Sequence, residues 1–318
     1  MELKNCEQSN IEMTAPQVQD NDWKYLIVSG DAFRVEINKH NGYLTKYEVN
    51  GQNMIKDGEA LTPNFWRAPT DNDFGAGLQR KYIVWKNPEI KLTSFNQRTE
   101  NNQVIVESAY DMPGVSAKLA LTYVINNAGA IKITPEADSR QERQSLRTCS
   151  VSVCRCPMPR SFETVEYYGR GPVENYSDRN HCTDLGIYRQ SVTEQFYPYI
   201  RPQENGTKTD IRWWKMLNQS GSGIKIVAEA PFSASALHYT IESLDEGLDK
   251  QQGHSQEVEE ADLTNLCIDK VQAGLGCEDS WGRIARPEYL VPYADYEFTF
   301  IPFSRAPQHR NRITFTAY

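Results

Sequence analysis

The stretch LIVSGDAFRVEINKHNGYLTKYEVNG, residues 26–51, contains the clearest fold signal in the chain. Between residues 33 and 37, apolar side chains alternate with polar ones, which is the period of a strand with one buried face. Asn41-Gly42 and Asn50-Gly51 interrupt the pattern, and Asn-Gly is the strongest short-range signal for a hairpin turn. The stretch therefore predicts short antiparallel strands joined by tight turns.

Similar short runs recur along most of the chain, each rich in β-branched or aromatic residues and bounded by Gly, Asn, Asp or Pro. They are residues 104–106, 117–125, 130–134, 149–154, 224–228, 237–241 and 296–303. Helix is expected only as a turn or two, at 141–146 or 244–252. This spacing predicts an all-β fold, a large antiparallel sandwich. Residues 1–22 are polar without an apolar period, so we expect a disordered linker or junction there.

The bulk composition excludes several classes of partner. A net charge of −8 over 318 residues makes nucleic-acid binding unexpected. No apolar run approaches the ~20 residues that span a bilayer, so no membrane segment is expected. The polar N-terminus contains Glu2, Glu7 and Glu12 and does not resemble a signal peptide, which leaves a cytoplasmic or periplasmic location open.

The seven cysteines are odd in number and scattered, which favours free thiols over a disulfide framework. Cys154-Arg155-Cys156 lacks the two-residue spacing of a zinc knuckle, so we interpret it as structural. We predict no metal or cofactor in this chain.

Four segments crowd Trp, Arg, Asn and acidic residues among glycines and prolines, a composition typical of binding loops on a rigid β scaffold. They are residues 64–77, 167–179, 197–206 and 274–281. A structural interpretation is open for each: Asx turns around Asp71-Asn72-Asp73, a buried ion-pair network around Glu174, and a core position for Trp281.

Catalytic patterns are absent from these segments. No spacing identifies the two carboxylates of a retaining glycosidase, which stand about 5–5.5 Å apart. The five histidines form no metal-ligand or triad pattern, and no Gly-x-Ser-x-Gly elbow occurs.

Together and in this order, the four segments resemble the C-terminal domain of the large bacterial β-galactosidases of glycoside hydrolase family two, also found as the small subunit of two-gene enzymes. The matching signatures are Phe65-Trp66-Arg67-Ala68-Pro69-Thr70-Asp71-Asn72-Asp73, Gly171-Pro172-Val173-Glu174-Asn175-Tyr176-Ser177-Asp178-Arg179, Arg201-Pro202-Gln203-Glu204-Asn205-Gly206 and Asp279-Ser280-Trp281. The resemblance runs from about Trp23 to Phe303 and implies a supersandwich domain at 23–305, galactose-mutarotase-like, with a C-terminal tail at 306–318.

The resemblance also implies roles for single residues. Trp281 is similar to the tryptophan that this domain contributes to the galactoside site, and it is the expected substrate contact. A loop that shifts between open and closed forms is expected at Asp73, Phe74, Gly75, Ala76 and Gly77. Residues that would line or support the site are Arg67, Asp71, Asn72, Glu174, Asn175, Arg201, Glu204, Asn205 and Asp279.

In the family, the catalytic glutamates and the Mg²⁺ and Na⁺ sites lie in a separate (β/α)₈ barrel. The leading hypothesis is therefore a small subunit or C-terminal domain that completes the galactoside site of such a barrel, inactive alone, within a homo-oligomeric parent. A non-catalytic carbohydrate-binding or architectural module is the alternative. Aldose epimerisation ranks below both, and it requires a His and Glu pair facing a sugar pocket.

Overall fold

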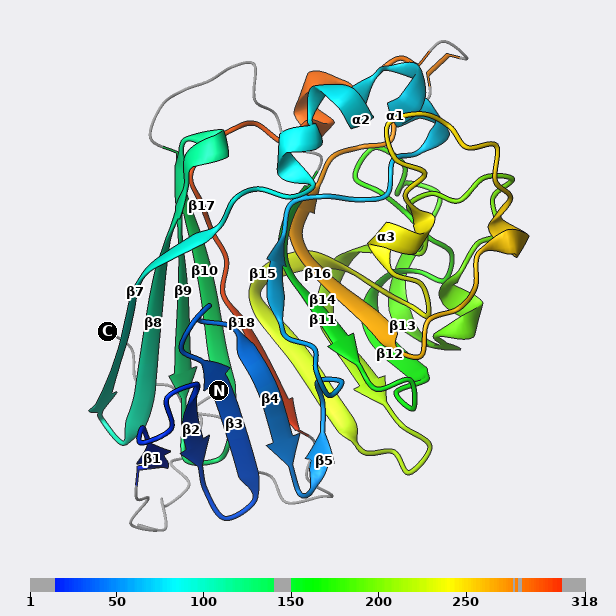
Figure 1. The fold of residues 1–318 in the computed structure, drawn as a ribbon. Coiled ribbons are helices and arrows are strands. Elements are labelled where there is room, and N and C mark those ends of the chain that lie inside the picture. Colours follow the sequence, from blue (N-terminus) through cyan, green and yellow to red (C-terminus); the bar gives the residue numbers. More distant parts are fainter. Residues whose placement is uncertain (1–14, 140–149, 277, 280–281, 305–318) are drawn as a thin grey trace, which may run out of the picture.

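The chain folds into two antiparallel β-sheets with a few short helices at one end (Figure 1). The computed structural model describes residues 15–139, 150–276, 278–279 and 282–304. The small sheet has the order β1-β2-β3-β4-β5. The main path of the large sheet has the order β13-β12-β14-β15-β18-β10-β9-β8-β7, and β6, β11, β16 and β17 attach to it. The predicted all-β antiparallel fold is confirmed.

The elements of the small sheet are β1 (Gln17–Gln19), β2 (Tyr25–Ser29), β3 (Phe33–Asn38), β4 (Leu44–Val49) and β5 (Gln52–Asn53). The large sheet contains β6 (Thr62–Asn64), β7 (Lys91–Glu100), β8 (Gln103–Met112), β9 (Ala117–Ile125), β10 (Ile131–Ser139), β11 (Ser150–Met158), β12 (Thr164–Gly171), β13 (Asp184–Ser191), β14 (Lys208–Leu217), β15 (Gly223–Leu237), β16 (Thr264–Gln272), β17 (Tyr296–Glu297) and β18 (Phe300–Ser304). The helices are α1 (Asp71–Gly75), α2 (Leu78–Lys81) and α3 (Ile241–Leu244), with 3₁₀ turns η1 (Ile83–Trp85), η2 (Pro113–Val115), η3 (Thr193–Gln195), η4 (Ser255–Glu257) and η5 (Pro287–Tyr289).

The small sheet packs its apolar face on the large one. Burial alternates strictly along β3, and Val35 and Ile37 belong to the same core cluster as Tyr123 of β9. The Tyr47 hydroxyl donates to the carbonyl oxygen of Gly129, in the β9–β10 turn, at 2.8 Å. The alternation seen in the sequence therefore specifies which face of the first sheet closes the sandwich.

The pairing of three strands determines where the polar segments meet. β11 pairs antiparallel with both β6 and β16, so β6 and β16 run in the same direction. Their carboxyl ends, at Asn64 and Gln272, consequently leave the sheet on the same side. The polar segments that follow them, far apart in sequence, begin as neighbours.

Several strands were not predicted because their sequences do not alternate. β7 is an exposed polar edge strand, β12 and β13 contain Tyr, Gly and Arg, and β14 mixes two Trp with Lys, Asp and Arg. β16, buried along most of its length, was also missed. The residues Tyr167 to Gly171, expected in a loop, form the end of β12.

Other expectations were wrong in detail. The predicted strand at 237–241 is the end of β15 followed by α3, because the capping box of Thr240 and Ser243 begins a helix there. The predicted helical turns at 244–252 are absent from that segment. β1 lies inside the expected 1–22 linker: Val18 pairs with Val28, so ordered chain begins before Trp23. The expected helix at 141–146 and the tail at 306–318 lie outside the described residues.

No helix among the described residues is both long and apolar enough to cross a bilayer.

Gly42 and Gly51 provide a matched test of the first sheet. Both have positive φ, +72° and +77°, but an added Cβ at Gly42 would lie 2.2 Å from the Tyr110 hydroxyl, whereas nothing lies within 4 Å at Gly51. We expect Gly51→Ala to lower the free energy of unfolding by about 1 kcal/mol through backbone strain. Gly42→Ala should lower it by roughly 2–4 kcal/mol because overpacking adds to that strain. Urea unfolding followed by circular dichroism would measure both, and equal losses would contradict the assigned contact.

Candidate functional site

A buried ion pair joins the segment after β6 to the segment after β16. The Arg67 guanidinium donates to both carboxylate oxygens of Asp73, at 3.2 and 2.9 Å, and both side chains are almost fully buried. It also donates to the carbonyl oxygens of Ala273, at 2.6 Å, and Gly274, at 3.3 Å. A planar guanidinium suits this arrangement because its donors form a rigid fork that matches a carboxylate.

Asp73 also takes part in the N-terminal cap of α1. The Thr70 hydroxyl accepts from the Asp73 N–H at 3.1 Å, and the Asp73 carboxylate accepts from the Thr70 N–H at 2.9 Å, which is a complete capping box. The acidic cluster expected as Asx turns is thus a helix cap. One carboxylate both pairs with Arg67 and caps the helix, so the entry to the predicted shifting loop is anchored.

Two further side chains hold the chain after β16. The Asp178 carboxylate accepts from the N–H groups of Leu275 at 3.0 Å and Gly276 at 2.8 Å. From the other side, the Asn72 amide donates to the carbonyl oxygens of Leu275 and Arg283, both at 2.9 Å. The first, second and fourth polar segments therefore meet around one turn.

The backbone of Gly282 lies against the end of α1. A Cβ built on Gly282 would stand 2.2 Å from the carbonyl carbon of Gly75 and 2.5 Å from the nitrogen of Ala76, and Gly282 has φ +79°. Only glycine fits this approach without strain. The residues predicted to form the shifting loop are therefore in contact with the residue that follows Trp281.

Trp281, the predicted sugar contact, lies outside the described residues, as do Cys277 and Ser280. Asp279 is exposed and accepts from the Arg283 N–H at 3.3 Å. Phe74 is half-buried with the Lys250 ammonium 5.7 Å from its ring centroid, and Gly77 begins α2 with φ +70°. Mobility of residues 73–77 stays a prediction.

Glu174 connects the second and third polar segments. Its carboxylate accepts from Arg179 at 2.6 Å, from the Tyr199 hydroxyl, and from the Gly206 N–H at 2.8 Å. The ion-pair interpretation of this motif therefore holds for Glu174 and Arg179, and the pair is extended by a tyrosine and a backbone amide.

Two asparagines fix the backbone of the same region. The Asn175 side chain accepts from the Thr209 N–H at 3.0 Å and from the Thr209 hydroxyl at 2.5 Å, and it donates to the carbonyl oxygens of Arg170 and Val173, both at 3.1 Å. Asn205 accepts from the Tyr197 N–H at 3.2 Å and donates to the Gln203 carbonyl at 3.0 Å. Both are buried, and both serve as loop braces.

Glu204 and Lys208 are the charged groups that burial perturbs most strongly here. Burial raises the pKa of the Glu204 carboxyl to about 7, although the Thr207 hydroxyl at 2.9 Å and nearby Arg67 oppose the rise. Burial lowers the pKa of Lys208 to about 8, and Glu174 opposes that fall. The Lys208 ammonium donates to Gln195 and to the Gly206 carbonyl, both at 2.8 Å. Glu204 is therefore partly protonated near neutral pH.

Asp71 and Arg201 form a separate, more exposed cluster. Arg201 Nε lies 3.6 Å from the Asp71 carboxylate, which also contacts the Lys250 ammonium, and Arg201 donates to Gln252 at 2.8 Å. The Asp71 N–H donates to Gln203 at 3.0 Å, so the first and third segments touch at the surface as well.

Two cavities flank the end of β16. One is lined by residues that include Arg67, Asn72, Leu275 and Ile284. The other is lined by residues that include Tyr176 and Gln272. The Arg67 network thus forms a wall of the first cavity, between α1 and the turn at 274–276.

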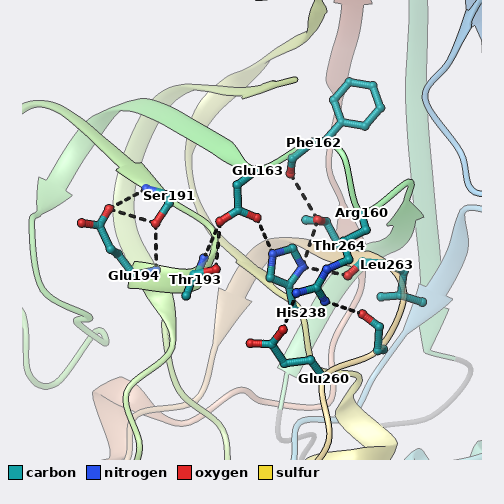
Figure 2. Close-up of polar contacts among 11 residues, drawn as sticks. Arg160, Phe162, Glu163, Ser191, Thr193, Glu194, His238, Glu260, Leu263 and Thr264 are labelled. Atoms are coloured by element: carbon teal, nitrogen blue, oxygen red, sulfur yellow. Dashed lines mark hydrogen bonds and ion pairs between the residues drawn. The ribbon is translucent and has the colours of Figure 1, made fainter. Parts of the chain in front are cut away.

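A His and Glu pair, the requirement set for an epimerase, occurs elsewhere, at His238 and Glu163 (Figure 2). His238 is 2% exposed; its Nε2 contacts the Glu163 carboxylate and its Nδ1 lies 2.9 Å from the Leu263 carbonyl oxygen. Burial would raise the pKa of Glu163, but hydrogen bonds from Thr193 and His238 outweigh it and lower the pKa. Both imidazole nitrogens therefore have partners within the fold. Neither residue lines the two cavities beside β16.

Cys154 and Cys156 are buried free thiols in the core of the large sheet, and burial raises the pKa of Cys156 to about 12. Across the described part of the chain, no three His, Cys, Asp or Glu side chains gather as a metal site. The structural interpretation of the Cys154-Arg155-Cys156 run agrees with this burial.

Sequence reasoning missed Asp178 and Lys208 as members of the network. Asp178 lies within a quoted motif beside several other charged residues, so its composition alone did not distinguish it. Lys208 begins β14, where an exposed lysine would be the ordinary expectation.

A protein-family model matches most of the chain. The model described as beta galactosidase small chain covers residues 29–301. The chain belongs to the β-galactosidase small-chain family. This small-chain domain is 31% identical over 289 residues to a β-galactosidase from Priestia megaterium, and 30% identical over 283 residues to one from Lactobacillus delbrueckii subsp. bulgaricus. The alignments cover 88% and 87% of this chain but 26% of each relative, so the small-chain domain spans about a quarter of their length.

Solved structures similar to the small-chain domain include a galactose 1-epimerase from Lactobacillus acidophilus and a putative aldose 1-epimerase from Escherichia coli K12. The TM-scores are 0.46 and 0.47 with 11% and 8% identity. The matches cover 91% and 92% of this chain and 96% and 99% of those structures. At such identity, the likeness concerns the fold.

Because the Arg67–Asp73 pair is buried, substituting Arg67 alone should lower stability more than substituting both residues. Arg67→Met leaves a buried unpaired carboxylate and should lower the free energy of unfolding by about 3–5 kcal/mol. Adding Asp73→Asn removes that charge and should restore part of the loss. Arg98→Ala, at an exposed pair with Glu107, is the control and should cost no more than about 1 kcal/mol. Chemical denaturation would contradict the assignment if Arg67→Met and Arg98→Ala were equivalent.

The raised pKa of Glu204 predicts a pH dependence of stability. Because the folded state holds this proton up to about pH 7 and the unfolded state only to about 4.5, stability from this group declines as pH rises between those values. The total is at most roughly 3.5 kcal/mol, at about 1.4 kcal/mol per pKa unit. Glu204→Gln should flatten the decline of unfolding free energy between pH 4.5 and 7. An unchanged profile would show that Glu204 titrates normally.

Proposed function

We propose that this chain is the C-terminal domain or small subunit of a glycoside hydrolase family two β-galactosidase. In this proposal it completes the galactoside site of a separate catalytic (β/α)₈ barrel. The observation that carries the proposal is that the first, second and fourth polar segments meet at one turn after β16. The chain in which they meet matches the family model of the β-galactosidase small chain. A folding unit needs no such concentration of buried polar contacts at one edge.

The proposed reaction is hydrolysis of terminal β-galactosides with retention, through a glycosyl-enzyme intermediate formed in the barrel. The two catalytic glutamates, and the Mg²⁺ and Na⁺ ions, would belong to that barrel. Relatives more than three times as long as this chain support a second, larger region of the enzyme. The parent enzyme is proposed to be a homo-oligomer.

Trp281 is the proposed sugar contact, because an aromatic face packs against the axial C–H groups of a pyranose. Arg67, Asn72 and Asp178 would position the segment that carries it, since they bind its flanking carbonyl and amide groups. Residues 73–77 would gate access to the sugar, and their contact with Gly282 couples the gate to that segment.

Hydrolysis of a chromogenic β-galactoside tests whether catalysis requires both this chain and the barrel. The purified chain alone should give no hydrolysis, whereas the same chain assembled with the barrel region encoded beside it should be active. In that assembly, Trp281→Ala should lower kcat/KM by at least about tenfold, which corresponds to roughly 1.4 kcal/mol of lost transition-state binding.

Trp23→Ala is the matched control, because Trp23 is 77% exposed beside β2 in the small sheet. It should leave kcat/KM unchanged. Hydrolysis by the isolated chain, or an equal loss in the two variants, would count against the proposal. A galactose titration in which the isolated chain binds sugar without any barrel would favour the carbohydrate-binding alternative.

A further inference from the structure

The outer face of the large sheet carries an apolar row that crosses five strands. Ile187, Tyr168, Trp213, Val227 and Ile301 stand directly opposite one another on β13, β12, β14, β15 and β18. Directly opposed residues share a face. On β12, β14, β15 and β18 the chain neighbours Tyr167, Trp214, Ile226 and Phe300 are fully buried, so this row points away from the core. At about 4.8 Å per strand, it is roughly 19 Å long. We call it the outer row.

The outer row is most open at its β13 end. Ile187 is 69% exposed and Tyr168 is 36% exposed, and Leu185 beside them is exposed as well. Within the described residues, β12 is the only strand that pairs with β13, which makes β13 an edge strand (Figure 1). It is eight residues long and contains neither a proline nor a register shift. Edge strands that stay uncovered are usually shortened, bulged or interrupted, and β13 is not.

Cations border this row in a chain that is otherwise acidic. Arg189, Glu166, Lys215 and Lys225 form the adjacent row on the same face. The ammonium groups of Lys215 and Lys225 lie 4.5 and 5.1 Å from the centroid of Trp213, and Arg212 lies over Tyr168 at 5.8 Å. Glu166 pairs with Lys215 at 2.7 Å, and the other three cations leave this border positive, whereas the whole chain has a net charge of −8.

We propose that the outer row and the free edge of β13 are a docking surface for the portion of the β-galactosidase that this chain lacks. That portion would present acidic side chains beside an apolar strip, and a strand of it could extend the sheet at β13. The inference rests on the proposed function for its partner. About three quarters of each matched relative lies outside this chain, so a large protein surface is available to cover the row. A second copy docked by the same face would oppose like charges, which disfavours that occupant.

Hydrogen exchange at β13 is the first test. Amides of residues 184–191 should exchange at least about tenfold more slowly in the complete enzyme, assembled from this chain and its encoded barrel region, than in the chain alone. Equal exchange in both would overturn the proposal. Protection already present in the isolated chain, lost on dilution, would assign the surface to a second copy and overturn it too.

Charge-selective variants are the second test. Ile187→Glu should weaken assembly at least about tenfold and Ile187→Lys should weaken it less, because the proposed partner surface is acidic. Trp23→Glu, at a site of similar exposure on the small sheet, is the control and should assemble normally. All three should leave the thermal midpoint of the isolated chain nearly unchanged, which excludes misfolding as the cause. Equal assembly of Ile187→Glu and Trp23→Glu, or a greater loss with Ile187→Lys, would overturn the proposal.

These outcomes test the docking surface and the proposed reaction independently. An assembly that protects β13 but hydrolyses no galactoside would keep the docking surface and refute the reaction. Galactoside hydrolysis by an assembly in which β13 exchanges freely would do the reverse.

Discussion

The guanidinium of Arg67 is buried between the segment that follows β6 and the segment that follows β16. Its bidentate bond to Asp73 neutralises a carboxylate that caps α1, and its bonds to Ala273 and Gly274 hold the chain as it leaves β16. Each of these groups would be costly to bury alone. The ion pair therefore makes the positions of α1 and of the turn at 274–276 depend on each other, and the other polar contacts are built around that dependence.

The topology of the large sheet explains how α1 and the turn at 274–276 come close enough to share the Arg67 ion pair. Because β6 and β16 both pair antiparallel with β11, their ends emerge on the same side, although about two hundred residues separate them. Asp178 approaches the same turn from the segment that follows β12. The large sheet thus acts as the scaffold on which distant motifs become neighbours, which is how loops on a rigid β framework acquire function.

The sequence predicted the parts of this arrangement that depend on local pattern. The alternation at 33–37 specified β3, and the composition of residues 64–77 and 197–206 identified segments that do meet in space. The sequence could not predict which acidic side chain pairs with which basic one. Asp71 and Asp73 are two residues apart and equally acidic in sequence, yet Asp73 is buried against Arg67 while Asp71 lies at the surface with Arg201 and Lys250. That difference arises from helix direction in α1 and from the strand pairing.

Glu204 and Lys208, near the site, each have a pKa shifted in the direction that opposes folding at neutral pH. Burial raises the pKa of Glu204 and lowers the pKa of Lys208, because it disfavours the charged form of both side chains. Apolar residues of similar volume would avoid that penalty, as they often do for buried charges. Lys208 instead binds the Gly206 carbonyl while Glu174 binds the Gly206 N–H, so the charges fix both sides of one glycine in the third motif. Because both charges lower stability at neutral pH, the polar geometry at this edge is selected for something other than stability.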